Sequence, residues 1–383
     1  MAEKVVVLGA GYAGAGAIPE LESELPGAEL VWISDNDYHL VLHESHRVIR
    51  DPSVQEKITI PVEDIKSPST EFVQGTVEDV DVAAREVSLD DGTTVDYDYL
   101  LVALGSGTAY YGIPGMEEYA HTLKSLDDAL AIHDAVADAA RQATRSDPAQ
   151  VVIGGAGLSG IQSAGEVAEY RDRHNAPIDI TLVEAMDDIM PGQSDDLQRT
   201  VRRHLEDAGV DILTNDPITE ATEDAIFFDE RDGLDYDVLL WTGGISGREA
   251  LGTADLDKEH NRLNVSSTFQ TSDDRVFAIG DTALVEQDDG IAPPTAQAAW
   301  QAAKVVATNV ANAIDGRPLE RWTFTDRGTL ISVGETAVAH DVGPVPVTTF
   351  NDYPAKFLKK FVAARWIADL TGWGRAVSAW DSL

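Results

Sequence analysis

Two glycine-rich stretches have the residue types and spacing to hold a phosphate-bearing cofactor. VVVLGAGYAG and VVIGGAGLSG each follow an apolar run and open a helical pattern. The glycines permit a tight turn and a close approach of backbone to a pyrophosphate, and the helix N-terminus favours negative charge. We therefore predict two nucleotide sites. Their glycines are Gly9, Gly11 and Gly14 in the first stretch and Gly155, Gly157 and Gly160 in the second.

A polar residue at the end of the next strand would complete each site by accepting hydrogen bonds from ribose hydroxyls. ELVWIS ends at Ser34-Asp35, about twenty residues beyond the last glycine of the first stretch, and ITLVEA carries Glu184. A carboxylate at Glu184 would repel a 2′-phosphate, so the second site is predicted to prefer NADH over NADPH. The alternative is a second flavin-like or vestigial site.

The elements that must position these residues alternate as strand, helix and strand, and the pattern occurs twice. The two copies lie 146 residues apart, from Gly9 to Gly155. Between them, a meander with an Asp91-Gly92 turn returns to a buried strand at Tyr99–Leu104. A matching run, AIFFDERDGLDYDVLLWTGG, closes the second copy and contains Gly243. The fold class is therefore α/β with two Rossmann-like dinucleotide-binding domains.

A third motif, TSDDRVFAIGD, ends in Gly280-Asp281. Here the chain resembles the two-dinucleotide-binding flavoprotein oxidoreductases, and the resemblance implies FAD in the first site, with Asp281 on its ribityl chain. YDYLLVALGS is similar to the family's linker motif, which adds Ala103 and Gly105; Leu104 stands where Thr is usual. The expected domains are a discontinuous FAD-binding domain at 1–115 and 265–345, an NAD-binding domain at 116–264 inserted in it, and a C-terminal segment at 346–383.

YHLVLHESHRVIRDP resembles the family's segment after the second strand. Alignment on Tyr38 puts Ser34 at the usual acidic position, so Ser34 and Asp35 both remain candidates for the FAD ribose. The charged residues that follow are interpreted as a surface network, and no metal site is expected. They are His43, Glu44, His46 and Arg47.

The absence of cysteine narrows the choice within this superfamily, because many members pass electrons through a cysteine pair. Instead, AQAAWQ resembles the quinone-site signature of the type II NADH:quinone oxidoreductases, which are single-subunit enzymes that do not pump protons. Gln297 and Gln301 lie four apart on one helix face, so two uncharged amide groups could donate to one quinone. The alternative is an ordinary alanine-rich helix that packs below the flavin.

Glu166 lies in GIQSAGE, six residues beyond Gly160. The resemblance implies a position beside the nicotinamide and the flavin edge, where a carboxylate could orient the ring or relay a proton. The alternative is an acid on the helix surface.

The charge balance is strongly acidic, with 67 Asp and Glu against 28 Lys and Arg and a net charge of -39. Such a surface repels nucleic acid, so DNA and RNA are excluded as partners. The acids are spread along the chain in short runs, which favours a solvated coat suited to concentrated salt and a halophilic source over a binding face for cations. We expect no secretory signal and no spanning helix.

The C-terminal stretch KFLKKFVAARWIADLTGWGRAVSAW reverses this charge balance, with five basic and two acidic residues in 353–383. We expect an amphipathic helix in a membrane interface, broken at Gly372 and Gly374, with an apolar arc opposite Lys356, Lys359 and Lys360. The alternative is a helix pair packed on the enzyme body or on a second subunit of a homodimer. Truncation before Tyr353 is expected to release the protein from membranes while NADH oxidation persists.

The expected function is oxidation of NADH through FAD, followed by two-electron reduction of a membrane quinone without proton pumping. The protein would lie peripherally on the cytoplasmic face of the cell membrane. Two alternatives are a soluble NADH-dependent flavoprotein reductase with a ferredoxin-like acceptor, and a non-catalytic NADH-sensing or assembly protein. Reduction of the flavin by NADH would argue against the second.

Overall fold

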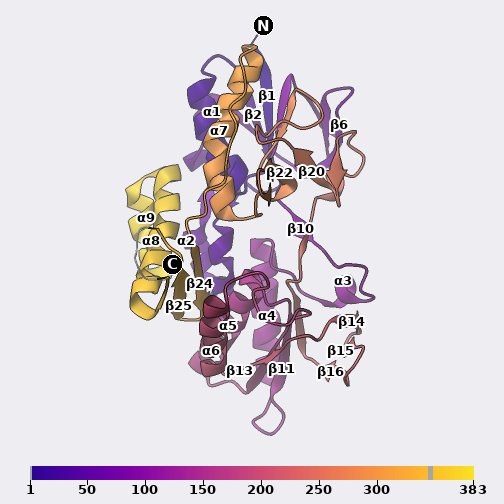
Figure 1. The fold of residues 1–383 in the computed structure, drawn as a ribbon, viewed down its shortest axis with the longest axis vertical. Helices are drawn as coiled ribbons and strands as arrows, with labels where there is room; N and C mark the ends of the chain where they lie inside the picture. The colour runs from indigo at the N-terminus through magenta and orange to yellow at the C-terminus, as the bar shows by residue number, and fades with distance from the viewer. Residues whose placement is uncertain (1, 344–347) are drawn as a thin grey trace.

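The computed structural model describes residues 2–343 and 348–383, and its upper half in Figure 1 is built on a five-stranded sheet. The strands, in spatial order, are β21 (Val276–Ala278), β9 (Tyr99–Val102), β1 (Lys4–Leu8), β2 (Glu29–Ser34) and β5 (Thr70–Gln74). All neighbours are parallel, and Val6 pairs with Val31 on one side and Leu100 on the other. The apolar run of β1 is buried because it lies at the centre of a sheet with both faces covered.

Helices α1 (Tyr12–Glu24) and α7 (Ala296–Ile314) pack against each other beside this sheet, as Figure 1 shows. The buried faces of both helices are rich in alanine, so their axes can approach closely. An antiparallel ribbon connects β5 to β9 and confirms the predicted meander; it consists of β6 (Val77–Asp81), β7 (Glu86–Leu89) and β8 (Thr94–Asp96). Gly92 has φ +82° in the turn between β7 and β8, which suits glycine.

The segment between β2 and β5 consists of short elements that wall the interior. They are β3 (Tyr38–Leu40), the 3₁₀ helices η1 (Leu42–Ile49), η2 (Pro52–Val54) and η3 (Val62–Asp64), α2 (Gln55–Ile58) and β4 (Thr59–Pro61), which pairs with β3. All side chains of η1 from Glu44 to Ile49 are buried.

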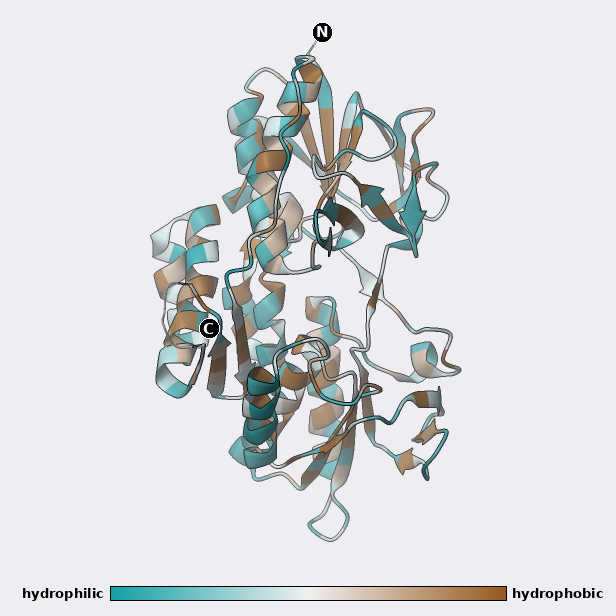
Figure 2. Cartoon of the chain, in the orientation of Figure 1, coloured by the Kyte–Doolittle hydropathy of each residue, from teal (hydrophilic) through white to brown (hydrophobic). Residues whose placement is uncertain are grey.

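The lower half repeats the parallel sheet with the strand order β13-β12-β11-β17. The bounds are β13 (Val210–Leu213), β12 (Ile178–Val183), β11 (Ala149–Gly154) and β17 (Val238–Trp241), with α4 (Leu126–Gln142), α5 (Leu158–His174) and α6 (Asp195–Asp207) as its helices. Figure 2 shows the strands largely in brown and α6 largely in teal, as expected for a buried sheet and an outer helix. A small antiparallel sheet lies at one side: β14 (Ile218–Ala221), β15 (Ala225–Phe228) and β16 (Leu234–Asp235).

The chain enters the lower half along β10 (Gly107–Thr108) and returns along β18 (Ile245–Ser246), and these two strands pair with each other. β21 then joins the first sheet beside β9, so the second Rossmann-like unit is inserted in the first, as predicted. The remaining elements of this region are α3 (Met116–Tyr119), η4 (Glu249–Leu251), β19 (Lys258–Glu259), β20 (Arg262–Val265), η5 (Gly280–Thr282), β22 (Ala283–Gln287) and β23 (Gly290–Ile291). The domain limits at 115, 264 and 345 remain a proposal.

The C-terminal segment folds as an antiparallel sheet followed by two helices, shown in yellow in Figure 1. Its elements are β24 (Thr329–Val333), β25 (Thr336–His340), β26 (Thr349–Asn351), α8 (Asp352–Thr371), α9 (Trp373–Ala379) and η6 (Trp380–Ser382). Gly372, with φ +89°, separates α8 from α9 at the predicted break. In the described ranges 2–343 and 348–383, no helix has the length and apolar character needed to cross a bilayer.

One part of the tail prediction is wrong. Lys359 does not lie on an outer polar face; it is buried with Ala363 and Trp366 on the face of α8 that packs against the protein. Phe357 and Phe361 are exposed instead. Because α8 contributes to the core, truncation before Tyr353 would uncover the interior, and NADH oxidation is expected to fall rather than to persist.

Candidate functional site

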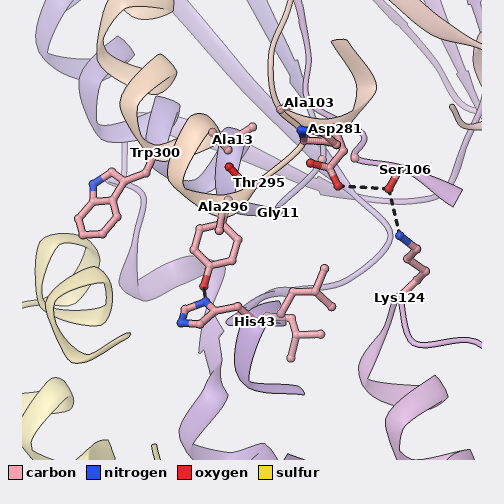
Figure 3. A pocket seen from close by; sticks show the side chains of 18 of the residues that line it. Gly11, Ala13, His43, Ala103, Ser106, Lys124, Asp281, Thr295, Ala296 and Trp300 are labelled. Atoms are coloured by element: carbon pink, nitrogen blue, oxygen red, sulfur yellow. Dashed lines mark hydrogen bonds between the residues drawn. The ribbon is translucent and has the colours of Figure 1, made fainter. Parts of the chain in front are cut away.

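One continuous cavity of about 2490 Å³ joins the two halves of the molecule. Its wall includes both glycine-rich loops, the end of β2, the Gly280-Asp281 turn, the start of α7 and the inner side of α8. Figure 3 shows part of this wall, with Trp300 directed toward the C-terminal helices. Most of the residues predicted from separate motifs are therefore brought to one site.

The first glycine-rich loop presents an uncapped helix end to the cavity. Gly11 is the N-cap of α1 and offers no side-chain cap, and a Cβ on Gly11 would meet nothing within 4 Å. Gly14 has the opposite constraint, because its Cβ would lie 1.9 Å from the Gly9 carbonyl oxygen. Gly14 thus allows close packing, while Gly11 leaves open space and free N–H groups where a pyrophosphate would fit.

The second loop repeats this arrangement at α5. Gly157 is an uncapped N-cap with open space around it, and a Cβ on Gly160 would lie 1.9 Å from the Gly155 carbonyl oxygen. Gly243 packs behind Gly155, since a Cβ on Gly155 would lie 2.8 Å from the Gly243 backbone. By contrast, Ser125, Ser194 and Thr295 cap α4, α6 and α7 with their side chains. The two nucleotide-type helices therefore keep their first N–H groups free for a ligand.

The carboxylate of Glu184 is fixed at the end of β12. One oxygen accepts a hydrogen bond from the Ala156 N–H at 2.8 Å, and the other accepts from the Met186 N–H at 3.0 Å. Glu184 is therefore held beside the second loop, where the sequence predicts the ribose.

Ser34 and Asp35 both line the cavity at the end of β2. Ser34 is buried and its hydroxyl donates to the Asp35 carboxylate at 3.2 Å, whereas Asp35 is exposed. The carboxylate is the more accessible acceptor, so this geometry favours Asp35 as the group that meets a ribose, with Ser34 as its support.

Asp281, Ser106 and Lys124 form a hydrogen-bonded chain between the halves, drawn in Figure 3. The Ser106 hydroxyl donates to Asp281 at 3.2 Å, and the Lys124 ammonium donates to Ser106 at 3.3 Å. Burial lowers the pKa of Lys124, partly offset by Asp281. Ala103 and Gly105 line the cavity beside them, as does Gly280. The sequence reasoning missed Lys124, because no motif marks it.

Glu166 is fully buried, so it is not a surface acid. Its carboxylate lies 2.9 Å from the Arg50 Nε and 3.9 Å from the His46 Nε2. Burial raises the pKa of Glu166 to about 7, against the opposing effect of Arg50. The carboxyl group can therefore exchange a proton near neutral pH, behind His46 and Gln162 in the cavity wall.

Gln297 and Gln301 line the cavity, but their amide groups already have partners. Gln301 donates to the Thr325 carbonyl at 2.9 Å and accepts from the Thr325 N–H at 3.2 Å. Gln297 accepts from the Arg327 N–H at 2.7 Å and donates to the Gly328 carbonyl at 3.3 Å. Both hold the segment leading to β24. Gln301 also donates to Gln297 Oε1 at 3.3 Å, so a quinone that accepts from Gln301 would have to displace a bond, whereas Gln297 has a second N–H besides the one that Gly328 accepts.

The residues His43, Glu44, His46 and Arg47 do not form the predicted surface network. Glu44, His46 and Arg47 are buried under α8, and Glu44 receives the Lys359 ammonium at 2.5 Å and the Arg47 Nε at 2.5 Å. Burial alone would raise the pKa of Glu44, but Lys359 and Arg47 outweigh it and hold the pKa well below its usual range. The prediction is wrong because proximity in sequence does not show what covers a group of charged residues, and here a helix more than 300 residues away covers them.

The comparisons with known proteins agree with this geometry. The family described as pyridine nucleotide-disulphide oxidoreductase matches residues 3–303. A type II NADH:quinone oxidoreductase of Staphylococcus saprophyticus is 31% identical over 98% of this chain and 97% of its own, and one from Staphylococcus aureus is 28% identical over the same shares.

Two solved structures share the fold. The chain is similar to NDH2 from Plasmodium falciparum, solved with NADH, with a TM-score of 0.83 at 16% identity over 100% of this chain and 98% of that one. It is also similar to a sulfide:quinone oxidoreductase from Aquifex aeolicus, with a TM-score of 0.81 at 19% identity over 97% and 92% of the two chains.

Proposed function

Since the chain belongs to the pyridine nucleotide-disulphide oxidoreductase family and, within it, to the type II NADH:quinone oxidoreductases, we propose that it oxidises NADH through bound FAD and reduces a membrane quinone without pumping protons. One observation carries the proposal. A single cavity connects the second glycine-rich loop, the first loop and the inner face of α8, so donor and acceptor have access to one centre.

The residues present fit FAD in the upper half. The free N–H groups of α1 at Gly11 would hold the pyrophosphate, Asp35 the ribose, and Asp281 the ribityl chain, with Ser106 and Lys124 keeping Asp281 in place. When bound, FAD supplies the chemistry that accepts a hydride and returns two electrons.

The lower half fits NADH. The free N–H groups at Gly157 would hold its pyrophosphate, and the fixed Glu184 carboxylate would accept from the ribose hydroxyls. A 2′-phosphate would meet this negative charge, so NADPH is disfavoured. Glu166, buried with Arg50, would hold or release a proton near the meeting point of the two halves.

We place the quinone where α7 faces α8. Trp300, Leu358, Phe361 and Val362 line this part of the cavity and offer an apolar surface to a flat ring. On the outer side, Phe357, Trp373 and Val377 are exposed at 50%, 59% and 71%, which suits contact with lipid. The protein would then sit on the cytoplasmic face of the membrane through residues 353–383.

The proposal is tested with purified holoprotein assayed with NADH or NADPH, each with and without a short-chain quinone. We expect quinone-dependent oxidation of NADH and much slower oxidation of NADPH. Activity with a soluble dye but none with quinone would favour a soluble reductase and reject the quinone site. If NADH fails to bleach the flavin absorbance, both enzymatic assignments fail.

A further inference from the structure

Tyr12, His43 and Glu44 form a connected chain in the cavity wall. The Tyr12 hydroxyl is hydrogen-bonded to His43 Nδ1, and His43 Nε2 lies 3.5 Å from a Glu44 oxygen. Tyr12 and His43 both line the cavity, and 30% of the His43 side chain is accessible. Glu44 has no exposure and is held by Arg47 and Lys359. Tyr12 and His43 therefore share the cavity wall, and Glu44 lies in the interior next to His43.

The carboxylate sets the tautomer of the histidine. Because Glu44 is ionised and faces Nε2, the ring proton belongs on Nε2, which leaves Nδ1 as an acceptor for the Tyr12 hydroxyl. Burial, and then the charge of Glu44, raise the pKa of Tyr12 well above its ordinary value, so Tyr12 keeps its proton at neutral pH. The Tyr12 hydroxyl is therefore held by His43 at the cavity wall with its proton in place.

We propose that Tyr12 is the proton donor to the quinone and that His43 and Glu44 are positioning residues that hold its hydroxyl at the cavity wall. This inference rests on the proposed function. Reduction of a quinone to a hydroquinone adds two electrons and two protons, and a hydride equivalent accounts for both electrons and one proton. The second proton leaves the Tyr12 O–H bond for the quinone oxygen, and a proton from cavity water then rebuilds that O–H bond. One proton from water is consumed in total.

Burial and the nearby cations keep the His43 ring neutral. Glu44 favours the imidazolium, whereas Arg47 on η1 and Lys359 on α8 oppose it. The neighbouring rings of His39 on β3 and His46 on η1 are also buried. Burial dominates and lowers the pKa of His43 to about 4. The ring therefore stays neutral near pH 7, and Nδ1 remains an acceptor for the Tyr12 hydroxyl.

Stopped-flow measurements on Tyr12→Phe and His43→Gln separate the two halves of the reaction. Tyr99→Phe is the matched control, since the Tyr99 hydroxyl donates to the Ala313 carbonyl, and Tyr99 does not line the cavity. Flavin reduction by NADH should change less than about twofold, while reoxidation by a short-chain quinone should slow about 100-fold, the usual worth of a positioned acid. Reoxidation by ferricyanide should not change, because ferricyanide takes electrons without protons. The solvent deuterium isotope effect on quinone reduction should differ between wild type and Tyr12→Phe.

A second readout needs no quinone. NMR of the protein with ¹⁵N-labelled histidine rings, assigned with His43→Gln, should show His43 as the neutral Nε2–H tautomer from pH 6 to 8, with its Nδ1 signal moved in Tyr12→Phe. Equal reoxidation rates in Tyr12→Phe and wild type, or an Nδ1–H tautomer, would overturn the proposal. A wild type that does not reduce quinone at all would instead reject the proposed function, and the tautomer would still test the geometry.

Discussion

Trp366 links the C-terminal helix α8 to the first nucleotide loop. Its indole Nε1 donates to His39 Nε2 at 2.9 Å, and His39 Nδ1 lies 2.8 Å from the Ala10 carbonyl oxygen in the glycine-rich turn. Trp366 is 1% exposed and His39 is fully buried. Burial lowers the pKa of His39 to about 4, so its neutral ring can accept at Nε2 and donate at Nδ1.

The substitution Trp366→Phe tests this link. It removes the donor to a buried histidine nitrogen, which costs about 1–3 kcal/mol when the acceptor is left unpaired. The smaller ring also leaves a void of roughly 40 Å³, worth about 1 kcal/mol at ~24 cal/mol per Å³. We therefore expect the free energy of unfolding to fall by about 2–4 kcal/mol, with weaker retention of FAD because the Ala10 turn loses its support.

Urea unfolding of the holoprotein and FAD retention on gel filtration measure these effects. Trp373→Phe is the matched control: the same substitution at a side chain that is 59% exposed should change stability by less than about 0.5 kcal/mol. His39→Leu should cost at least as much as Trp366→Phe, because it leaves both the Trp366 N–H and the Ala10 carbonyl oxygen without their partner. If Trp366→Phe and Trp373→Phe behave alike, α8 does not support the flavin loop.

Three further substitutions test single groups of the site. Glu166→Gln should flatten the pH dependence of the free energy of unfolding between about pH 4.5 and 7. Because the pKa of Glu166 is about 7 in the folded protein, the native state keeps this proton at pH values where the unfolded chain has lost it, and wild-type stability falls as the pH rises through this window. Urea midpoints at several pH values measure the effect. Glu184→Gln should reduce the preference in kcat/KM for NADH over NADPH about tenfold or more, and an unchanged ratio in parallel assays would refute its role. Gln301→Ala should lower the urea midpoint by releasing Thr325, and a raised KM for quinone without loss of stability would instead assign Gln301 to the ligand.

The cofactor loops could be predicted from sequence because their chemistry is local. In each loop the last glycine of the motif must pack against the carbonyl of the first, as Gly14 does against Gly9, and the acceptor follows at the end of the adjoining strand. Glu184 is fixed by backbone groups close to it in space and in the same βαβ unit, so its placement also followed from the pattern.

The interior of the site could not be predicted, because its partners are far apart in the chain. Glu44 and Lys359 are separated by 315 positions and His39 and Trp366 by 327, and no periodicity links them. A helix with lysines and aromatic residues indicates an amphipathic surface element, but α8 buries Lys359 because Glu44 compensates its charge. Only tertiary packing decides which lysine of the three turns inward.

The central claim is that electrons pass from NADH to a quinone within one cavity. The most direct measurement mixes the purified holoprotein with NADH under anaerobic conditions, follows the flavin absorbance, and then adds a short-chain quinone in a second mix. The proposed function predicts rapid bleaching by NADH, followed by recovery of the oxidised flavin spectrum with one hydroquinone formed per NADH consumed. Bleaching without recovery on adding quinone would contradict it.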